Sequence, residues 1–268
     1  MPKELTLKVP EISFDTVIEK ASQLPLVRID REEFLTKNLG RVCTRTQLRK
    51  ALAEGTLHAG IPIGILDMLA QEAINAETLR VTAISTVAGL PGGLAMLGTI
   101  PADLVQFYGH VLRVAQELAY LYGWTEMSSN LDTATESQLV LFLGVMAGVQ
   151  AAKNAVTKLF GEVAAKSVAK KVAAKALTKT WYYPIIKKVM GTLGQKVTKE
   201  TFGKAVGKVV PVLGGAISGG LTVATFAPMA KKLKNHLSRL AHMSPKEYEE
   251  YETAQEKLLQ ENAKVKKQ

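Results

Sequence analysis

Apolar residues recur every three or four positions along most of this chain, which is the spacing of an amphipathic α-helix. Phe14, Val17, Ile18, Ala21 and Leu24 form the first such series, and a proline follows them directly. Strand signals are almost absent, because no long run of alternating β-branched residues lies between hairpin turns. The sequence therefore predicts an all-α fold.

Capping residues predict where the helices begin and end. Three pairs have the spacing of a capping box, in which each side chain bonds the backbone N–H of the other residue: Asp30 with Glu33, Thr44 with Gln47, and Ser244 with Glu247. With the glycines and prolines at the boundaries, they predict helices over residues 30–40, 44–55, 62–88, 101–122, 134–179 (as one or two helices), 212–240 and onward from residue 245.

Composition divides the chain into three parts. We expect an N-terminal helical segment over residues 1–55, a helical domain over residues 56–240, and a polar C-terminal helix or tail over residues 241–268. The last part carries six glutamates between residues 247 and 261. It should either move freely or dock against a lysine-rich segment in the middle of the chain.

Glycines are spaced for close helix packing. Pairs four residues apart occur five times: Gly60/Gly64, Gly89/Gly93, Gly144/Gly148, Gly203/Gly207 and Gly215/Gly219. Such pairs let helix backbones approach closely, so we expect a multi-helix bundle with glycine-rich, closely packed central helices. Helices near lipid and tight bundles in water both use this pattern, and both readings remain open.

Three stretches contain no charged residue: 81–102, 137–152 and 209–230. Crossing a membrane takes about 20 continuous apolar residues in a helix, and prolines interrupt the first and the last of these stretches. Buried core helices, or a hairpin that enters one leaflet, fit better than a simple span. The N-terminus lacks a signal-peptide pattern and Cys43 has no partner thiol, so we expect a cytoplasmic protein.

Positive charge is concentrated in residues 153–208, which we call the lysine block. It contains thirteen lysines, no arginine and two acids, within a chain of net charge +10. Lysine acts as a point charge near lipid headgroups, whereas base and phosphate recognition in nucleic acids favours arginine. An anionic membrane surface is thus the expected partner, nucleic acid is disfavoured, and a merely solvated face is the alternative. The predicted lipid- or anion-binding residues are Lys153, Lys158, Lys166, Lys170, Lys171, Lys175, Lys179, Lys187 and Lys188.

One candidate for chemistry stands out, on the otherwise apolar helix over residues 101–122. Asp103, Gln106, His110, Arg113 and Glu117, here called the polar stripe, fall within about 80° of one another on a helical wheel. Buried ionisable groups must pair, as Asp103 with His110 or Arg113 with Glu117 could. Asp103, His110, Arg113 and Glu117 are the catalytic candidates, as a proton switch or an acid–base pair; a satisfied polar edge is the alternative.

Other chemistries find no support in the sequence. The histidines lack the paired spacing of metal ligands, and the loop over residues 89–93 lacks the ending of a phosphate-binding loop. We therefore predict no metal and no cofactor, and favour a non-enzymatic role over an enzyme.

Residues 89–123 resemble the core signature of EcsC-family proteins. The matching residues are Gly89-Leu-Pro-Gly-Gly93, a helix that bears Asp103, and Arg113-Val-Ala-Gln-Glu117-Leu-Ala-Tyr-Leu-Tyr122-Gly123. Residues 210–220 are similar to the family's glycine-rich C-terminal segment, whereas the aspartate usual just before the family's proline stands here two residues after Pro101. The family is named for a gene beside an ABC-type exporter operon. The resemblance implies a peripheral membrane helper of export or envelope processes, with a membrane transporter as partner and no assigned activity.

The preferred hypothesis is a cytoplasmic helical accessory protein that is peripheral to the inner face of the cell membrane. One alternative is a membrane-inserting or pore-forming protein whose apolar hairpin, over residues 139–152 or 209–227, leaves a soluble bundle. The other alternative is an enzyme of unknown reaction that uses the polar stripe.

Overall fold

The structure is a computed structural model that describes residues 13–88, 102–125, 127, 133–165, 182, 184–194 and 211–265. Its helical elements are α1 (Phe14–Ser22), the short 3₁₀ turn η1 (Pro25–Val27), α2 (Arg31–Leu39), α3 (Arg45–Glu54), the 3₁₀ turn η2 (Thr56–His58), α4 (Ile63–Ala88), α5 (Ala102–Leu121), α6 (Thr133–Met146), α7 (Gln150–Ala165), a helix over residues 184–194, α9 (Pro211–His242) and α10 (Pro245–Val265). These residues include no strand, and the predicted all-α class is confirmed.

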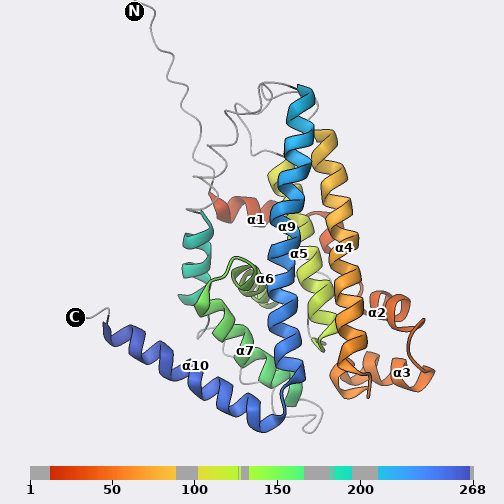
Figure 1. Cartoon of the computed structure of the whole chain (residues 1–268), viewed down its shortest axis with the longest axis vertical. Helices are drawn as coiled ribbons and strands as arrows, with labels where there is room; N and C mark the ends of the chain where they lie inside the picture. The colour runs from red at the N-terminus through yellow and green to blue at the C-terminus, as the bar shows by residue number, and fades with distance from the viewer. Residues whose placement is uncertain are drawn as a thin grey trace, which may run out of the picture.

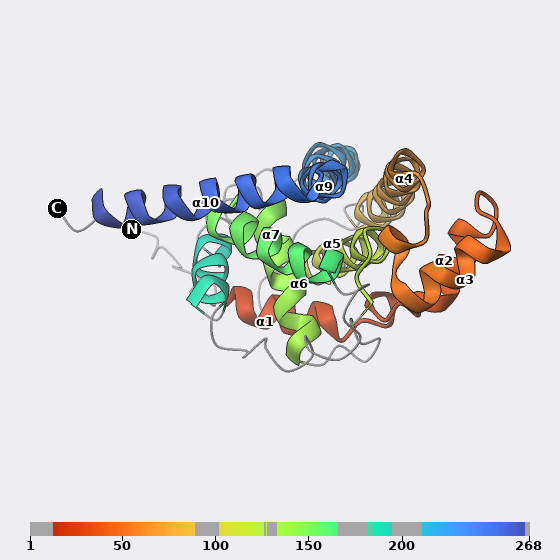
Figure 2. The same ribbon diagram turned by 90° about the horizontal axis from the view of Figure 1, so that it is seen from below.

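Two long helices form one side of the molecule. α4 and α9 run antiparallel and pack along most of their length (Figure 1). α5 packs against both of them and against α1, while α2 and α3 lie beyond α4 (Figure 2). α7 and the helix over residues 184–194 lie toward the opposite end of this view from α2 and α3.

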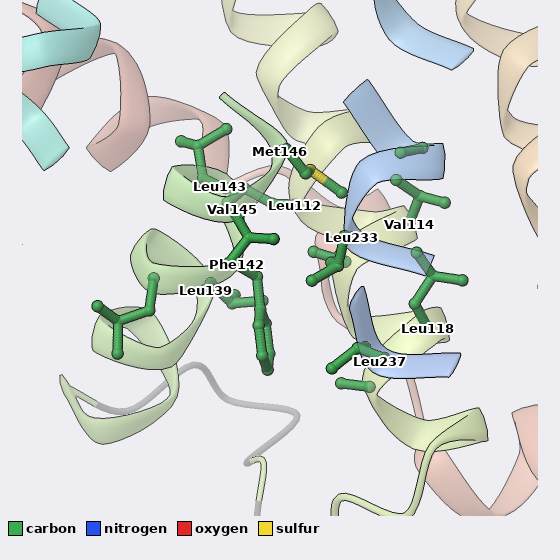
Figure 3. Close-up of a cluster of buried hydrophobic side chains, with 14 of the residues drawn as sticks. Leu112, Val114, Leu118, Leu139, Phe142, Leu143, Val145, Met146, Leu233 and Leu237 are labelled. Carbon is green, nitrogen blue, oxygen red and sulfur yellow. The ribbon is translucent and has the colours of Figure 1, made fainter. Parts of the chain in front are cut away.

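The core is centred on α6, where it meets α5 and α9. Figure 3 shows this cluster, and each of its labelled side chains is buried: Leu112, Val114, Leu118, Leu139, Phe142, Leu143, Val145, Met146, Leu233 and Leu237. Burying a leucine or phenylalanine side chain contributes about 1.5–3 kcal/mol to stability. From Leu139 onward α6 is apolar on every face, which is typical of a helix buried on all sides.

The predicted helix boundaries are confirmed by the caps. The Asp30 carboxylate accepts a hydrogen bond from the Glu33 backbone at 2.8 Å, and both halves of the Thr44–Gln47 box are present. Ser244 and Glu247 form the same reciprocal pair at the start of α10. Gly123 has φ +97°, a conformation that L side chains rarely adopt, and it closes α5.

The segment predicted as one or two helices over residues 134–179 is two helices within its described part. α6 ends at Met146 and α7 begins at Gln150, because Gly148 turns the chain with φ +81°. α9, in contrast, continues through Pro228 over its whole length.

The polar C-terminal helix docks on the start of the lysine block. The Tyr248 hydroxyl of α10 donates to the Thr157 carbonyl of α7, and Gln150 donates to Gln255 at 3.0 Å. α7 contains the first lysines of the block. This part of α10 is therefore docked, which is one of the two expected outcomes.

The glycine pairs act differently from the expectation. Gly60 and Gly148 have positive φ and lie outside helices, so neither Gly60/Gly64 nor Gly144/Gly148 forms a groove between two helices. Of the four glycines in these two pairs, Gly144 makes a close approach: a Cβ there would lie 2.5 Å from the Ala152 Cβ and 2.8 Å from Val189. Gly215 and Gly219 lie within α9, and the other two pairs lie outside the described residues.

Gly144→Ala should therefore destabilise the protein. The added methyl group overlaps Ala152 and Val189, and such overpacking costs about 1–3 kcal/mol. Gly64→Ala is the matched control, because a Cβ at Gly64 meets nothing within 4 Å. Urea denaturation of both variants measures the difference; equal stability of the two would contradict this account of the α6 contact.

Candidate functional site

The polar stripe of α5 faces α4 and the chain between α1 and α2. His110 and Glu117 are each 4% exposed, and Arg113 is partly exposed. Gln106 has a side-chain oxygen that is buried without a hydrogen-bond partner among the described residues. Asp103 belongs to α5, but its side chain lies outside the described residues. The structure thus brings His110, Arg113 and Glu117 into one site.

The centre of this site is Glu77 of α4, which sequence reasoning missed. Glu77 is fully buried; its Oε2 lies 2.7 Å from His110 Nδ1, and its Oε1 accepts from Arg113 Nε at 3.0 Å and from Arg80. His110 therefore pairs with a residue of another helix. The suggested pair of Asp103 with His110 lies outside the described residues, because the Asp103 side chain does. The second predicted pair is confirmed, since Arg113 Nε lies 3.1 Å from Glu117 Oε1.

A signal for Glu77 is present in the sequence. Leu66, Ala70, Ile74 and Val81 form the buried face of α4, and Glu77 stands on the same face between Ile74 and Val81. An acidic residue within an apolar series at helical spacing lies on the buried face of the helix. Its carboxylate then needs a buried cation as a partner. Here it meets two guanidinium groups and an imidazole, which we call, together with Glu117, the Glu77 cluster.

The Glu77 cluster also holds the N-terminal segment in place. Arg113 Nη1 donates to the Leu26 carbonyl at 2.7 Å, and Gln116 donates to the Val27 carbonyl at 2.6 Å. Arg31 reaches in the other direction, to the carbonyls of Leu52 and Trp124 at 2.9 and 3.1 Å. These bonds connect residues 13–55 to α5, so the predicted N-terminal segment shares its packing with the rest of the bundle.

The two carboxyl groups of the cluster have opposite pKa shifts. Burial alone would raise the pKa of Glu77, but the His110 hydrogen bond and the charges of Arg113 and Arg80 hold it below its ordinary value. Burial, and then the negative charge of Glu77, raises the pKa of Glu117 to about 8 against the attraction of Arg113. At neutral pH Glu77 is ionised and Glu117 is protonated, which is the arrangement that separates a base from an acid.

A cleft of about 450 Å³ lies over the Glu77 cluster. Glu117, Arg113 and Arg80 line it from α5 and α4, and residues 28–41 form its other wall. Ile29, Phe34, Ala73 and Ala76 supply apolar lining. Arg28 and Lys37 add positive charge, Asp30 and Glu33 add negative charge, and Arg41 and Glu72 pair with each other. The cleft therefore offers a small molecule both apolar surface and buried polar groups, as ligand sites generally do.

The predicted lysines occupy another part of the molecule. Lys158, Lys187 and Lys188 are exposed and Lys153 is half-buried; they lie on α7 and on the helix over residues 184–194. The remaining predicted lysines lie outside the described residues: Lys166, Lys170, Lys171, Lys175 and Lys179. These two helices lie toward the opposite end of Figure 2 from α2, whose residues form a wall of the cleft.

Metal and thiol chemistry find no support in the described part of the chain. No group of three or more histidine, cysteine or acidic residues is placed there to hold a metal ion. Burial raises the pKa of the free Cys43 thiol, which is the opposite of what activates a cysteine nucleophile.

Comparison with known proteins does not identify the chain. No protein-family model, no curated protein and no solved structure matches it, so the EcsC resemblance stays a prediction. Among the residues that the structure describes, no helix combines the length and the apolar character that crossing a membrane requires.

Glu77→Gln should destabilise the fold strongly. It leaves Arg80 and Arg113 beside a neutral amide, and breaking a buried ion pair costs about 3–5 kcal/mol. Glu72→Gln is the matched control on the same helix, because Glu72 pairs with Arg41 where both side chains are about half exposed. Removing that pair should cost less than about 1 kcal/mol in urea denaturation. Similar losses in the two variants would show that Glu77 is not the structural centre.

Glu117→Gln should change how stability depends on pH. The pKa of Glu117 rises from 4.5 to about 8 on folding, so the folded state binds the proton more tightly. Wild-type stability should therefore fall as pH rises from 4.5 to 8, by at most about 1.4 kcal/mol per pH unit from this group. Glutamine cannot ionise, so the variant should lack this decline and gain relative stability across the window. Denaturation at pH 5, 6.5 and 8 measures it; a pH-independent difference would contradict the assignment.

Proposed function

We propose that the protein attaches to an anionic membrane surface from the cytoplasmic side and acts there as a peripheral accessory protein. The observation that carries the proposal is the uncharged end of the α4–α9 pair. The EcsC resemblance, with its implied transporter partner and export or envelope role, agrees with this proposal.

The uncharged ends of α4 and α9 lie at the same end of the molecule. α4 has no charged residue after Arg80, and α9 has none before Lys231. Because the two helices are antiparallel, residues 81–88 and 211–230 come together, and they project beyond the other described helices at the top of Figure 1. We call these two segments the apolar end.

Large apolar side chains are exposed at or beside the apolar end. Leu79 is 73% exposed on α4, directly before the apolar end, and Val223 is 44% exposed within it on α9. Exposed apolar side chains that gather in one region of a surface favour contact with a lipid or a protein partner. Burying the exposed Leu79 and Val223 side chains against a partner would thus be favourable.

Cations border the apolar end on α9. Lys231 and Lys232 follow it directly and are exposed. α9 contains no acidic residue at all. Basic groups at such a border meet lipid phosphates while the apolar part enters the headgroup layer, each worth about 1 kcal/mol near an anionic surface.

The shorter of the two uncharged segments, residues 81–88, limits how deeply the apolar end can insert into a membrane. Residues 81–88 of α4 extend about 12 Å, at 1.5 Å per residue, which reaches into one leaflet of a bilayer about 30 Å thick. This favours attachment to one face of the membrane over the pore-forming alternative. Of the two hairpins considered for insertion, residues 139–152 form the buried α6 and the start of α7, and their release would open the core.

Leu79→Glu should weaken membrane binding. In flotation with vesicles containing anionic lipid, the variant should bind at least tenfold less, since burying a leucine contributes about 1.5–3 kcal/mol. Met68→Glu is the matched control: Met68 is 44% exposed on α4, eleven residues before Leu79 and so on the same face about 16 Å from it. It should float like the wild type.

The same vesicles separate the alternatives. Attachment predicts weaker binding to neutral lipid and at high salt, with no release of an encapsulated dye. Dye release would favour the pore-forming alternative. If the wild type floats with neither anionic nor neutral vesicles, the membrane proposal is wrong.

A further inference from the structure

The Glu77 cluster carries an excess of positive charge toward the cleft. Two guanidinium groups, those of Arg80 and Arg113, share the single ionised carboxylate of Glu77. The second carboxyl group, Glu117, is protonated at neutral pH and does not balance them. Arg80 is 54% exposed and Arg113 25% exposed, and both line the cleft, so a ligand there can reach this charge.

Protonated Glu117 brings an O–H donor to the lining of the cleft. A protonated carboxyl group has one O–H donor, and the guanidinium of Arg113 beside it has only donors. Only 4% of the surface of Glu117 is exposed, and this residue lines the cleft. A buried donor without an acceptor costs about 1–3 kcal/mol, so an acceptor oxygen in the cleft would stabilise the site.

The walls of the cleft select for a ligand with both an anionic and an apolar part. Arg28 and Lys37 line the opposite wall, and neither forms an ion pair among the described residues. Arg41 is neutralised by Glu72, while Asp30, which caps α2, and Glu33 are carboxylates of the same wall. The four remaining cations, Arg28, Lys37, Arg80 and Arg113, thus face three ionised carboxylates, Asp30, Glu33 and Glu77, so the balance stays positive. Between these charges Phe34, Ala73 and Ala76 present apolar surface, and the volume of about 450 Å³ lies in the range of small-molecule sites.

We infer that this cleft binds a small molecule through an oxyanion group, a phosphate or a carboxylate, held between Arg80 and Arg113, with the Glu117 hydroxyl donating to one of its oxygens. The rest of the ligand lies against Phe34, Ala73 and Ala76. A free phosphate ester and a phospholipid headgroup share this chemistry. The site is independent of the apolar end, so either proposal can stand without the other.

Binding should depend on pH through Glu117. The charged groups around it are Glu72, Glu77 and Arg80 from α4, His110 and Arg113 from α5, and Arg28, Asp30, Glu33, Lys37 and Arg41 from residues 28–41. Deprotonating Glu117 removes the donor and adds a negative charge that repels the oxyanion. Affinity should be full below pH 8 and should fall as the pH rises through that value.

Sulfate is the first probe, because its charge does not change between pH 7 and pH 9. Calorimetric titration of the full chain at constant ionic strength should show saturable binding at pH 7. The affinity should fall about tenfold at pH 9, since the protonated fraction of a group of pKa 8 drops from about 0.9 to about 0.1. Glu117→Gln keeps a donor and cannot ionise, so its affinity should change less than about twofold over the same range.

Two arginine variants localise the site. Arg80→Gln should weaken sulfate binding at least about tenfold at pH 7, because a charge-assisted contact is lost. Arg41→Gln, the matched control at the edge of the cleft, should leave the affinity within about twofold, since Glu72 already neutralises Arg41. No saturable binding at pH 7, an unchanged pH profile in Glu117→Gln, or equal losses in the two arginine variants would each overturn the inference.

Two further arms distinguish the sources of the oxyanion. If glycerol 3-phosphate competes with sulfate and Arg80→Gln floats on phosphatidic acid vesicles like the wild type, the ligand is a free phosphate ester. If glycerol 3-phosphate does not compete and Arg80→Gln loses flotation on these vesicles but not on phosphatidylserine vesicles, the ligand is a lipid headgroup. Either result supports oxyanion binding in the cleft. Leu79→Glu retains sulfate binding in both cases, which keeps this test separate from that of membrane attachment.

Discussion

The ionised carboxylate of Glu77 constrains more of this structure than any other single group among the described residues. A buried carboxylate costs several kcal/mol unless donors surround it. Its donors come from its own helix and from α5, where His110 and Arg113 hold both of its oxygens. Arg113 then reaches the Leu26 carbonyl, so the requirement of one carboxylate connects three elements far apart in the sequence. The angle and register of α4 against α5 follow from this requirement together with the apolar contacts beside it.

The cleft lies beside the same arrangement. Arg80 and Arg113 line it from α4 and α5, opposite residues 28–41. Phe34, Ala73 and Ala76 line the remaining space without filling it. Glu117 stays protonated because burial, and then the negative charge of Glu77, raises its pKa. The charge imbalance that favours an oxyanion is thus a consequence of burying two carboxyl groups beside one another.

The two proposed functional surfaces differ in their physical basis. The cleft depends on directional bonds between buried groups, so small changes in geometry alter it. The apolar end depends on exposed area, on Leu79 and Val223, and on bordering cations that attract any anionic surface. α4 belongs to both, with Arg80 at the boundary between them. α6 contributes to neither and fills the centre of the bundle.

Local patterns in the sequence determined the helices and their ends. The Thr44–Gln47 and Ser244–Glu247 caps and the Arg113–Glu117 pair involve residues three or four apart, whose geometry the helix itself sets. Only the tertiary structure decided that His110 meets Glu77, because that contact joins residues 33 positions apart through the packing of two helices. It also decided that Gly144 packs closely while Gly148 turns the chain, and that residues 139–146 lie inside the core. Spacing along one helix specifies a face, and the partner of that face is specified only when the whole bundle assembles.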